Sequence, residues 1–217
     1  MKKYDIAVFD VDGTLLDTTE GVLSAVRYTI KNYNLPSLSE EQLKTFIGPP
    51  IQDSFQKYYQ LNEKENQRLA ECFRDRYKNF DLLKAVPYPG IFDAIDVLYQ
   101  NDIKIAVATY KRQDYAIKLL KHFQFDKYTD IMYGADNFNK LKKKDIIIKC
   151  MEDLGVTDYS KAVMIGDTDN DAIGADEIGM NFLGVTYGFG FKNLNDVKQY
   201  PAIGSVDSAE DISAYFV

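Results

Sequence analysis

Short apolar runs alternate with helix-like segments through most of the chain, and this alternation restricts the folds that the chain can adopt. The apolar runs have the length of buried strands and cover residues 6–9, 103–110, 131–134, 162–167, 181–188 and 202–206. The helix-like segments cover residues 90–101, 113–123, 143–154, 169–179 and 208–214. Helices between consecutive strands favour a parallel sheet that is covered on both faces. We therefore predict an α/β fold, a Rossmann-like parallel sheet with helices on both faces.

One long segment interrupts this alternation. Residues 18–81 have the spacing of amphipathic helices and no convincing strand, and Ser39 with Gln42 predicts a capping box at one helix start. The sequence therefore predicts a core domain of residues 1–17 and 82–217 and an inserted all-helical domain of residues 18–81. Insertions of this length usually have a function, often as a cap over an active site.

Five aspartates follow two of the predicted strands. Asp10 and Asp12 come directly after the first apolar run, and the other three stand at the end of the run 162–167 or just beyond it: Asp167, Asp169 and Asp171. Ligands of open parallel sheets bind beyond the carboxyl ends of the strands, so we expect these side chains to gather at one edge. A cluster of carboxylate oxygens without matching histidine or cysteine ligands indicates Mg²⁺. The metal ion would also offset the repulsion between two carboxylates spaced two residues apart.

A magnesium site of this kind favours phosphoryl chemistry, because Mg²⁺ typically binds one or two carboxylates together with substrate phosphate oxygens. The nucleophile is then either a metal-bound water or a carboxylate that forms an aspartyl-phosphate. In the second case one member of the pair Asp10 and Asp12 attacks phosphorus. Its neighbour protonates the leaving oxygen and later deprotonates water. Thr109 and a lysine after the third strand would hold the remaining phosphate oxygens.

These motifs resemble those of the haloacid dehalogenase superfamily of aspartyl-phosphate phosphatases, over nearly the whole chain. The first motif, D-x-D-G-T, is present as Asp10, Asp12, Gly13 and Thr14, the second as Thr109, and the fourth, G-D-x-x-x-D, as Gly166, Asp167 and Asp171. The resemblance implies that Asp10 is the nucleophile, Asp12 the acid–base group and Thr109 a phosphate ligand. The metal ligands implied in the same way are Asp10, Asp12, Asp167 and Asp171. Further substrate contacts are implied at Gly13, Thr14, Thr109 and Tyr110.

The third motif departs from the common K-P-x-P form and reads KLKKKDIII over residues 140–148. Its distance from the stretch DLG at 153–155 favours Lys143 as the catalytic and phosphate-binding lysine, with Lys142 as the alternative. Asp171 has two readings here, as a metal ligand or as the residue that orients Lys143.

Within the superfamily the chain is similar to the phosphoglycolate phosphatase branch, whose cap often contains a segment like FIGPPIQDSF at 46–55. We expect Gly48 and Gln52 of this segment to contact the substrate. Haloacid dehalogenases proper lack the second aspartate of the first motif, whereas Asp12 is present. Members similar to phosphoglucomutases have a histidine where Val22 stands.

The sequence thus predicts a Mg²⁺-dependent phosphatase that hydrolyses a small phosphomonoester through an aspartyl-phosphate, similar to phosphoglycolate phosphatase. The alternatives are a 5′-nucleotidase or sugar-phosphate phosphatase, a phosphoglucomutase-like phosphotransferase, or a phosphate-binding protein without turnover. The partner is then a small phosphorylated metabolite. The net charge of −7, from 26 basic and 33 acidic residues, does not favour nucleic acid. No apolar stretch approaches the roughly 20 residues of a membrane span, so we expect a cytoplasmic monomer or homodimer without a membrane partner.

Overall fold

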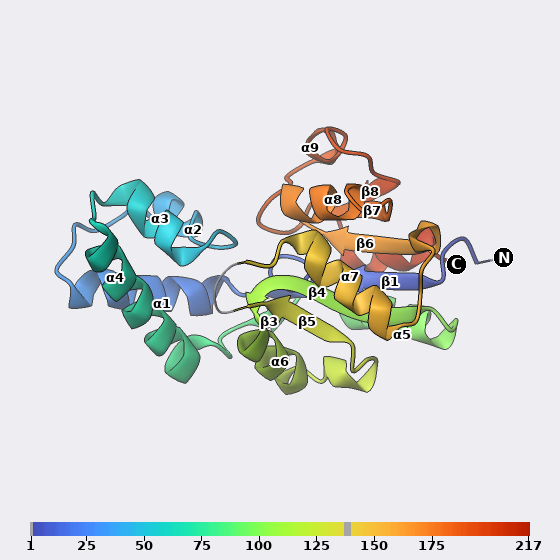
Figure 1. Ribbon diagram of the computed structural model, residues 1–217, viewed down its shortest axis with the longest axis horizontal. Helices are drawn as coiled ribbons and strands as arrows, with labels where there is room; N and C mark the ends of the chain where they lie inside the picture. Colours follow the sequence, from blue (N-terminus) through green and yellow to red (C-terminus); the bar gives the residue numbers. More distant parts are fainter. Residues whose placement is uncertain (1, 137–139) are drawn as a thin grey trace. The chain divides into compact units, whose positions relative to one another are not determined.

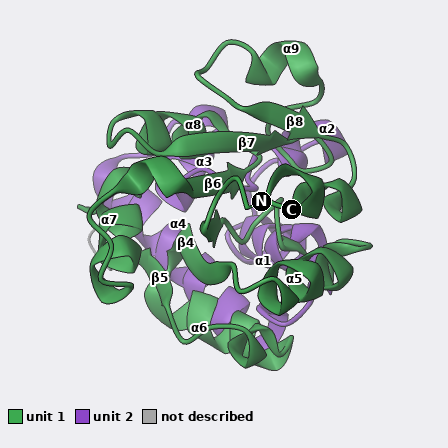
Figure 2. Ribbon diagram, turned by 90° about the vertical axis from the view of Figure 1, so that its right-hand side faces the viewer, with its two compact units in different colours: residues 1–17, 87–217 green, residues 18–86 purple. Residues whose placement is uncertain are grey.

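The computed structural model describes residues 2–136 and 140–217, and the chain divides into two compact units. Figure 2 shows the first unit, residues 1–17 and 87–217, in green and the second, residues 18–86, in purple. The second unit extends beyond residue 81, where the sequence pattern predicts its end. The reason is that Lys84 stays attached to it, with its carbonyl oxygen accepting from the Gly21 N–H at 3.0 Å and its ammonium 2.7 Å from Asp81 Oδ1.

The first unit is built on a six-stranded sheet in which every strand pair is parallel. In spatial order the strands are β5 (Met132–Ala135), β4 (Lys104–Arg112), β1 (Ile6–Phe9), β6 (Ala162–Gly166), β7 (Asn181–Val185) and β8 (Gly204–Val206). The chain fills one side of β1 first and the other side afterwards, so the strand order reverses between β1 and β6. Such a reversal places a ligand crevice at the carboxyl ends of these two strands. The predicted parallel α/β fold is confirmed.

Helices cover both faces of this sheet. They are α5 (Ile91–Gln100), α6 (Gln113–His122), α7 (Lys143–Asp153), α8 (Asp169–Asp176) and the short α9 (Leu194–Val197), with 3₁₀ turns η2 (Phe125–Lys127) and η3 (Tyr159–Lys161). Figure 2 shows α7 and α8 on one side of the sheet and α5 on the other. The strands β1 and β6 are buried along their whole length, as expected for central strands of a covered parallel sheet.

Two predicted elements differ in the structure. The segment predicted as an α-helix over 208–214 is the 3₁₀-helix η4 (Ala209–Tyr215), which packs on α5, because a short apolar pattern does not distinguish the two helix types. The strand predicted over 103–110 continues to Arg112. Two short strands that were not predicted, β2 (Leu16–Asp17) and β3 (Val86–Pro87), form a separate sheet.

The second unit consists mainly of helices (Figure 1). They are α1 (Thr19–Asn32), α2 (Glu40–Lys44), α3 (Ile51–Tyr58), α4 (Glu63–Arg76) and the π-helix η1 (Tyr77–Asp81). The predicted capping box at Ser39 and Gln42 opens α2. Nowhere in the described residues is there a helix with the length and apolar character needed to cross a membrane.

A buried carboxylate ties three parts of the second unit together. Asp81 is fully buried and accepts a hydrogen bond from Ser24 Oγ of α1 at 2.9 Å. It also pairs with Arg76 at 2.8 Å and Lys84 at 2.7 Å. Burial would raise the pKa of Asp81, but the hydrogen bonds from Lys84, Arg76 and Ser24 outweigh it and hold the pKa below its ordinary value.

Candidate active site

The loop after β1 forms a tight turn against the end of β6. The Asp10 N–H donates to Ile165 O at 2.9 Å, which continues the pairing of β1 with β6. Gly13 has a φ of +83°, and its N–H donates to Leu16 O at 3.0 Å. A Cβ at Gly13 would lie 2.2 Å from Asp167 Oδ2, so this position has no room for a side chain. The turn therefore brings the first and fourth motifs into contact.

A buried lysine bridges two of the carboxylates. Lys143 is the first residue of α7, and its Nζ lies 2.7 Å from Asp10 Oδ1 and 2.6 Å from Asp171 Oδ1. The carboxylates of Asp10, Asp167 and Asp171 each offer an oxygen within 4.8 Å of the others. Lys142, the other candidate of the third motif, is exposed at the N-cap of α7. The structure therefore brings Lys143 to the aspartates and leaves Lys142 at the surface.

Two contacts set the position of Lys143. The hydroxyl of Tyr110 accepts the backbone N–H of Lys143 at 2.8 Å, which fixes the start of α7 against the end of β4. Gly174 of α8 faces the stem of the lysine, and a Cβ there would lie 2.9 Å from Lys143 Cβ. Tyr110, predicted to bind substrate, uses its hydroxyl here to hold the lysine-bearing helix.

One oxygen of Asp171 accepts hydrogen bonds within the first unit, and the other makes an ion pair with Lys143. Oδ2 accepts from the Thr168 N–H at 3.1 Å and from the Thr168 hydroxyl at 2.7 Å, in the capping box of α8. Oδ1 faces the Lys143 ammonium. Of the two readings left open by the sequence, this geometry fits the orientation of Lys143.

Asp167 has a different environment. It is fully buried, and its Oδ2 accepts from the N–H groups of Phe189 at 2.7 Å and Gly190 at 3.1 Å. Its Oδ1 is buried and has no hydrogen-bond partner within residues 2–136 and 140–217. Burial raises the pKa of Asp167 to about 8, with further contributions from Asp171 and Asp10, and the two backbone amides oppose the rise.

The charges of Asp10 and Lys143 influence each other. Burial raises the pKa of Asp10 to about 6, while Lys143 opposes the rise and Asp171 adds to it. Burial disfavours the Lys143 ammonium, but Asp10 and Asp171 outweigh it and hold the pKa of Lys143 above its ordinary value. Buried carboxylates are stable only when paired or bound to a metal. Asp10, Asp167 and Asp171 form an all-oxygen donor set in which Asp167 keeps a buried oxygen without a hydrogen-bond partner among the described residues, and this fits a divalent cation such as Mg²⁺.

Asp12 pairs with a lysine that the sequence analysis did not single out. Lys111 Nζ lies 3.0 Å from Asp12 Oδ1, and the lysine side chain is only 7% exposed. Lys111 follows Thr109 by two residues on β4, in a stretch where the pairing of β4 with β5 is irregular. The prediction ended this strand at residue 110, which placed Lys111 in a loop. A cation two residues after Thr109 is the signal that could have identified it.

The remaining first-unit candidates lie at the same strand ends. Thr109 is buried, and its hydroxyl oxygen accepts the Lys111 N–H at 3.1 Å. Thr14 is fully buried, and its Oγ1 has no hydrogen-bond partner among the described residues. Both hydroxyls are therefore held in the interior close to the end of their strand or turn.

Two predicted substrate contacts belong to the second unit. Gly48 precedes α3, has a φ of +100° and has open space where a side chain would stand. Gln52 of α3 is held by α4, because its Oε1 accepts from Arg74 Nη2 at 2.9 Å and its carbonyl oxygen from Asn66 Nδ2 at 3.1 Å. Their contact with substrate stays a prediction.

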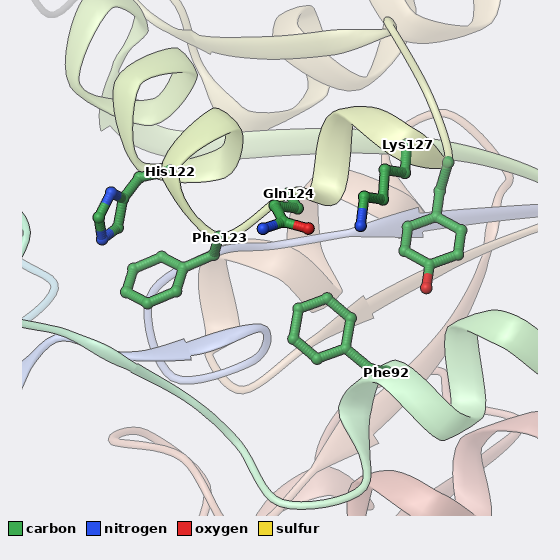
Figure 3. A pocket seen from close by; sticks show the side chains of 6 residues that line it. Phe92, His122, Phe123, Gln124 and Lys127 are labelled. Carbon is green, nitrogen blue, oxygen red and sulfur yellow. The ribbon is translucent and has the colours of Figure 1, made fainter.

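Two cavities of the first unit lie apart from the aspartates. One, of about 410 Å³, is lined by Phe92 of α5 and by side chains from the segment 122–128, including the exposed His122 (Figure 3). The other, of about 570 Å³, is lined by residues between Thr186 and Tyr215. Neither lining includes an aspartate of the cluster or Lys143.

Comparison with known proteins agrees with this geometry. Residues 7–185 match the model of a family described as haloacid dehalogenase-like hydrolases. A protein named 5′-nucleotidase from Pseudomonas aeruginosa is 29% identical over 188 residues, covering 87% of this chain and 85% of its own length. A protein named phosphoglycolate phosphatase from Agrobacterium fabrum is 30% identical over 191 residues, covering 85% and 81%. The solved structure of a haloacid dehalogenase-like family hydrolase from Streptococcus pneumoniae superposes with a TM-score of 0.89 at 27% identity, covering 98% of both chains.

Proposed function

This chain belongs to the haloacid dehalogenase-like hydrolase family, and from that premise we propose that it is a phosphatase acting on a small phosphomonoester. The observation that carries the proposal is the buried Lys143 ammonium between Asp10 and Asp171, two members of the aspartate cluster that Asp167 completes. This arrangement combines a carboxylate nucleophile with a fixed positive charge for the phosphoryl oxygens. The names of the nucleotidase and phosphoglycolate phosphatase relatives support the same reaction class.

In the proposed reaction, an Asp10 oxygen attacks phosphorus and the bond from phosphorus to the ester oxygen breaks. The product of this step is an aspartyl-phosphate, and the Asp12 carboxyl group donates its proton to the leaving oxygen. Asp12 then removes a proton from a water molecule, which attacks phosphorus and releases inorganic phosphate and free Asp10. Lys143 holds the phosphoryl oxygens through both steps, since its stem is fixed by α7 and α8.

The side chains of Asp10 and Asp167 and the main-chain carbonyl of Asp12 would hold Mg²⁺. Asp171 is less suited to this role, because one of its oxygens faces Lys143 and the other closes the α8 cap. When bound, the ion supplies positive charge that neutralises the phosphate and the attacking carboxylate. Asp167 gains the most from it, since its buried Oδ1 has no partner among the described residues.

Lys111 favours one class of substrate over another. Asp12 must reach the leaving oxygen, so the ammonium 3.0 Å from Asp12 lies close to the leaving group. An anionic group next to the ester oxygen would be stabilised there, whereas the neutral ribose of a nucleotide would not. We therefore place a small phosphorylated acid such as phosphoglycolate first and a 5′-nucleotide second. The helical segment 18–81 acts in this proposal as a cap that selects the leaving group.

The test is a comparison of 2-phosphoglycolate, a 5′-nucleoside monophosphate and p-nitrophenyl phosphate as substrates, after chelation and after Mg²⁺ is restored. Hydrolysis should require Mg²⁺ and should disappear in Asp10→Asn with an unchanged circular dichroism spectrum. Substantial hydrolysis by the folded Asp10→Asn variant, or full activity after chelation, would contradict the mechanism. Absence of turnover for every substrate would favour a phosphate-binding protein.

A second experiment tests the proposed class of substrate by comparing the effect of one Lys111 variant on two substrates. Lys111→Met should reduce kcat/KM for 2-phosphoglycolate by about 10- to 150-fold more than for p-nitrophenyl phosphate, given the roughly 1.5–3 kcal/mol typical of charge-assisted hydrogen bonds. Equal losses on both substrates would remove the argument for an anionic leaving group and leave the phosphatase assignment intact.

A further inference from the structure

A glycine-containing loop encloses the carboxylate of Asp167. This loop, residues 187–191 with the sequence YGFGF, follows β7 and is called the aspartate-binding loop below. The N–H groups of Phe189 and Gly190 both donate to Asp167 Oδ2, at 2.7 and 3.1 Å, and the Phe191 N–H donates to the Asp167 carbonyl oxygen at 2.7 Å. Three consecutive backbone amides are thus directed at one residue of the neighbouring strand end.

The two glycines of the loop are required for space. A Cβ at Gly188 would lie 2.3 Å from Gly13 O and 2.5 Å from Asp167 Oδ2. A Cβ at Gly190 would lie 2.3 Å from the Asp167 carbonyl oxygen. Any side chain at either position would push the loop away from Asp167, and the two amide donors would move with it.

Contacts on both sides fix the aspartate-binding loop. The Tyr187 hydroxyl donates to Thr14 O at 3.0 Å, and its ring packs against Tyr88 with centroids 4.7 Å apart. Lys192 Nζ donates to Gly188 O at 2.8 Å. The loop is therefore attached at Tyr187 to the turn that follows β1, and Lys192 holds the backbone of Gly188 at the other end.

The two carboxylate oxygens of Asp167 therefore differ in their hydrogen-bond partners. Oδ2 has two amide donors, whereas Oδ1 is buried without a partner in the part of the chain that the structure describes. We propose that the aspartate-binding loop restricts Asp167 to binding a cation through Oδ1 alone, and that this favours Mg²⁺ over Ca²⁺. Mg²⁺ requires a small octahedral site, while Ca²⁺ takes more ligands and often binds both oxygens of a carboxylate. The inference rests on the proposed metal site and adds to it a structural cause for the choice of ion.

The test measures binding of the ion directly, by calorimetric titration of Mg²⁺ and separately of Ca²⁺ into chelator-treated protein. Gly190→Ala should weaken Mg²⁺ binding by about tenfold or more, the effect typical of losing a hydrogen-bond partner of a metal ligand. Ca²⁺ binding should weaken less, because a released Oδ2 can join Oδ1 on the larger ion. The Mg²⁺ to Ca²⁺ affinity ratio should therefore fall.

A matched control separates this effect from crowding in general. Gly204→Ala introduces a Cβ 2.3 Å from the Tyr215 hydroxyl, in β8 of the same unit, without touching Asp167. Its affinities for both ions should stay within about twofold of the wild type, a change below about 0.5 kcal/mol. Lys192→Met and Tyr187→Phe, which remove the anchors of the loop without adding atoms near Asp167, should lower the same ratio by a smaller factor.

The possible results distinguish the role of the aspartate-binding loop from the existence of the metal site. Unchanged Mg²⁺ affinity in folded Gly190→Ala, or equal losses for Mg²⁺ and Ca²⁺, would overturn the role of the loop. The same holds if Gly204→Ala reproduces the full effect. If Gly190→Ala does not fold, unchanged ratios in both anchor variants would overturn it. Failure of the wild-type protein to bind Mg²⁺ would instead contradict the proposed metal site itself.

Discussion

Replacement of Lys143 by methionine is the sharpest single perturbation of this site. The substitution keeps a long unbranched side chain between α7 and α8 but removes the ammonium that lies 2.7 Å from Asp10 and 2.6 Å from Asp171. We expect kcat to fall by a factor of at least about 10²–10³, from two separate losses. KM for a small substrate should change much less, because the ammonium acts mainly on charge that develops in the transition state.

The first loss concerns the ionisation of the nucleophile. A nearby opposite charge lowers a carboxyl pKa, so without Lys143 the pKa of Asp10 should rise above its value of about 6. At pH 7 a smaller fraction of Asp10 is then ionised and able to attack phosphorus. The acid limb of the pH–rate profile should move to higher pH accordingly. Mg²⁺ bound at the proposed site would oppose this rise in the pKa of Asp10. With Mg²⁺ bound, the loss of ionised Asp10 should therefore be smaller than the second loss.

The second loss concerns charge on the phosphoryl group. A preorganised donor directed at developing negative charge is typically worth about 10²–10³ in kcat, and this sets the lower limit of the expected effect. It does not depend on pH near neutrality, because Asp10 and Asp171 keep Lys143 protonated in the wild type.

The assay is steady-state hydrolysis of p-nitrophenyl phosphate at saturating Mg²⁺ from about pH 5 to 9. Lys142→Ala and Lys144→Ala are the matched controls, since Lys142 is exposed and Lys144 makes a half-exposed pair with Glu177 at 3.3 Å. Surface pairs of this kind contribute about 0–1 kcal/mol, so both controls should retain nearly full activity. A folded Lys143→Met enzyme within tenfold of the wild type would refute the reasoning, and an inactive Lys142→Ala would move the third motif by one residue. Lys143→Gln serves as the second variant if the methionine variant does not fold.

Three further predictions concern the other parts of the molecule. Asp12→Asn should lower kcat by about 10²–10⁴ with KM nearly unchanged, because protonation of the leaving group and activation of water both fail; a change confined to KM would assign Asp12 a binding role. Asp81→Asn should destabilise the protein by about 3 kcal/mol in denaturant titration at pH 7, since Arg76 and Lys84 lose a fully buried carboxylate. The pKa of Asp81 is lowered in the folded state, so its contribution is present above the ordinary carboxyl pKa and is lost as the pH falls through the folded value. The difference in stability between the variant and the wild type should therefore shrink as the pH falls below the ordinary carboxyl range, and a constant difference would contradict this account. Gln52→Ala should change the ranking of natural substrates more than the hydrolysis of p-nitrophenyl phosphate, and a parallel fall on all substrates would exclude the helical unit as the selector.

The fold could be predicted because short stretches of the sequence indicate where each strand begins and ends. The run Ile6–Phe9 and the run that forms β6 are continuous apolar segments of strand length, and each is followed by polar residues that mark its carboxyl end. Parallel strands bring such ends to one edge of the sheet, so the pattern alone predicts that aspartates about 150 positions apart in sequence lie near each other. The same reasoning predicts that Thr109 lies at this edge, although it says nothing about the hydrogen bonds of the hydroxyl.

Contacts made by backbone atoms could not be predicted in this way. The amides of Phe189 and Gly190 hold Asp167, but a backbone donor carries no residue-type signal beyond the glycines that make room for it. The choice between Lys142 and Lys143 was also open, because a shift of one residue at a helix start leaves the sequence pattern almost unchanged. The answer depends on which lysine is the N-cap of α7. Lys142 is the N-cap and is exposed, whereas Lys143 is the first helical residue and its side chain meets Gly174 of α8.

The distribution of charge among these residues explains why Asp167 would gain most from the proposed cation. Lys143 contacts both Asp10 and Asp171, although its single charge offsets only one of them, and Lys111 contacts Asp12. Asp167 receives only neutral backbone amides, and in keeping with this its pKa, about 8, is raised further than the value of about 6 for Asp10. Both lysines are held by the acidic side chains that they contact, so neither can move to Asp167 without leaving another acidic side chain unpaired. A divalent cation is therefore a partner that Asp167 could gain at no cost to the other pairs, and in the proposed reaction the same ion would bring positive charge to the Asp10 oxygen that approaches an anionic phosphate.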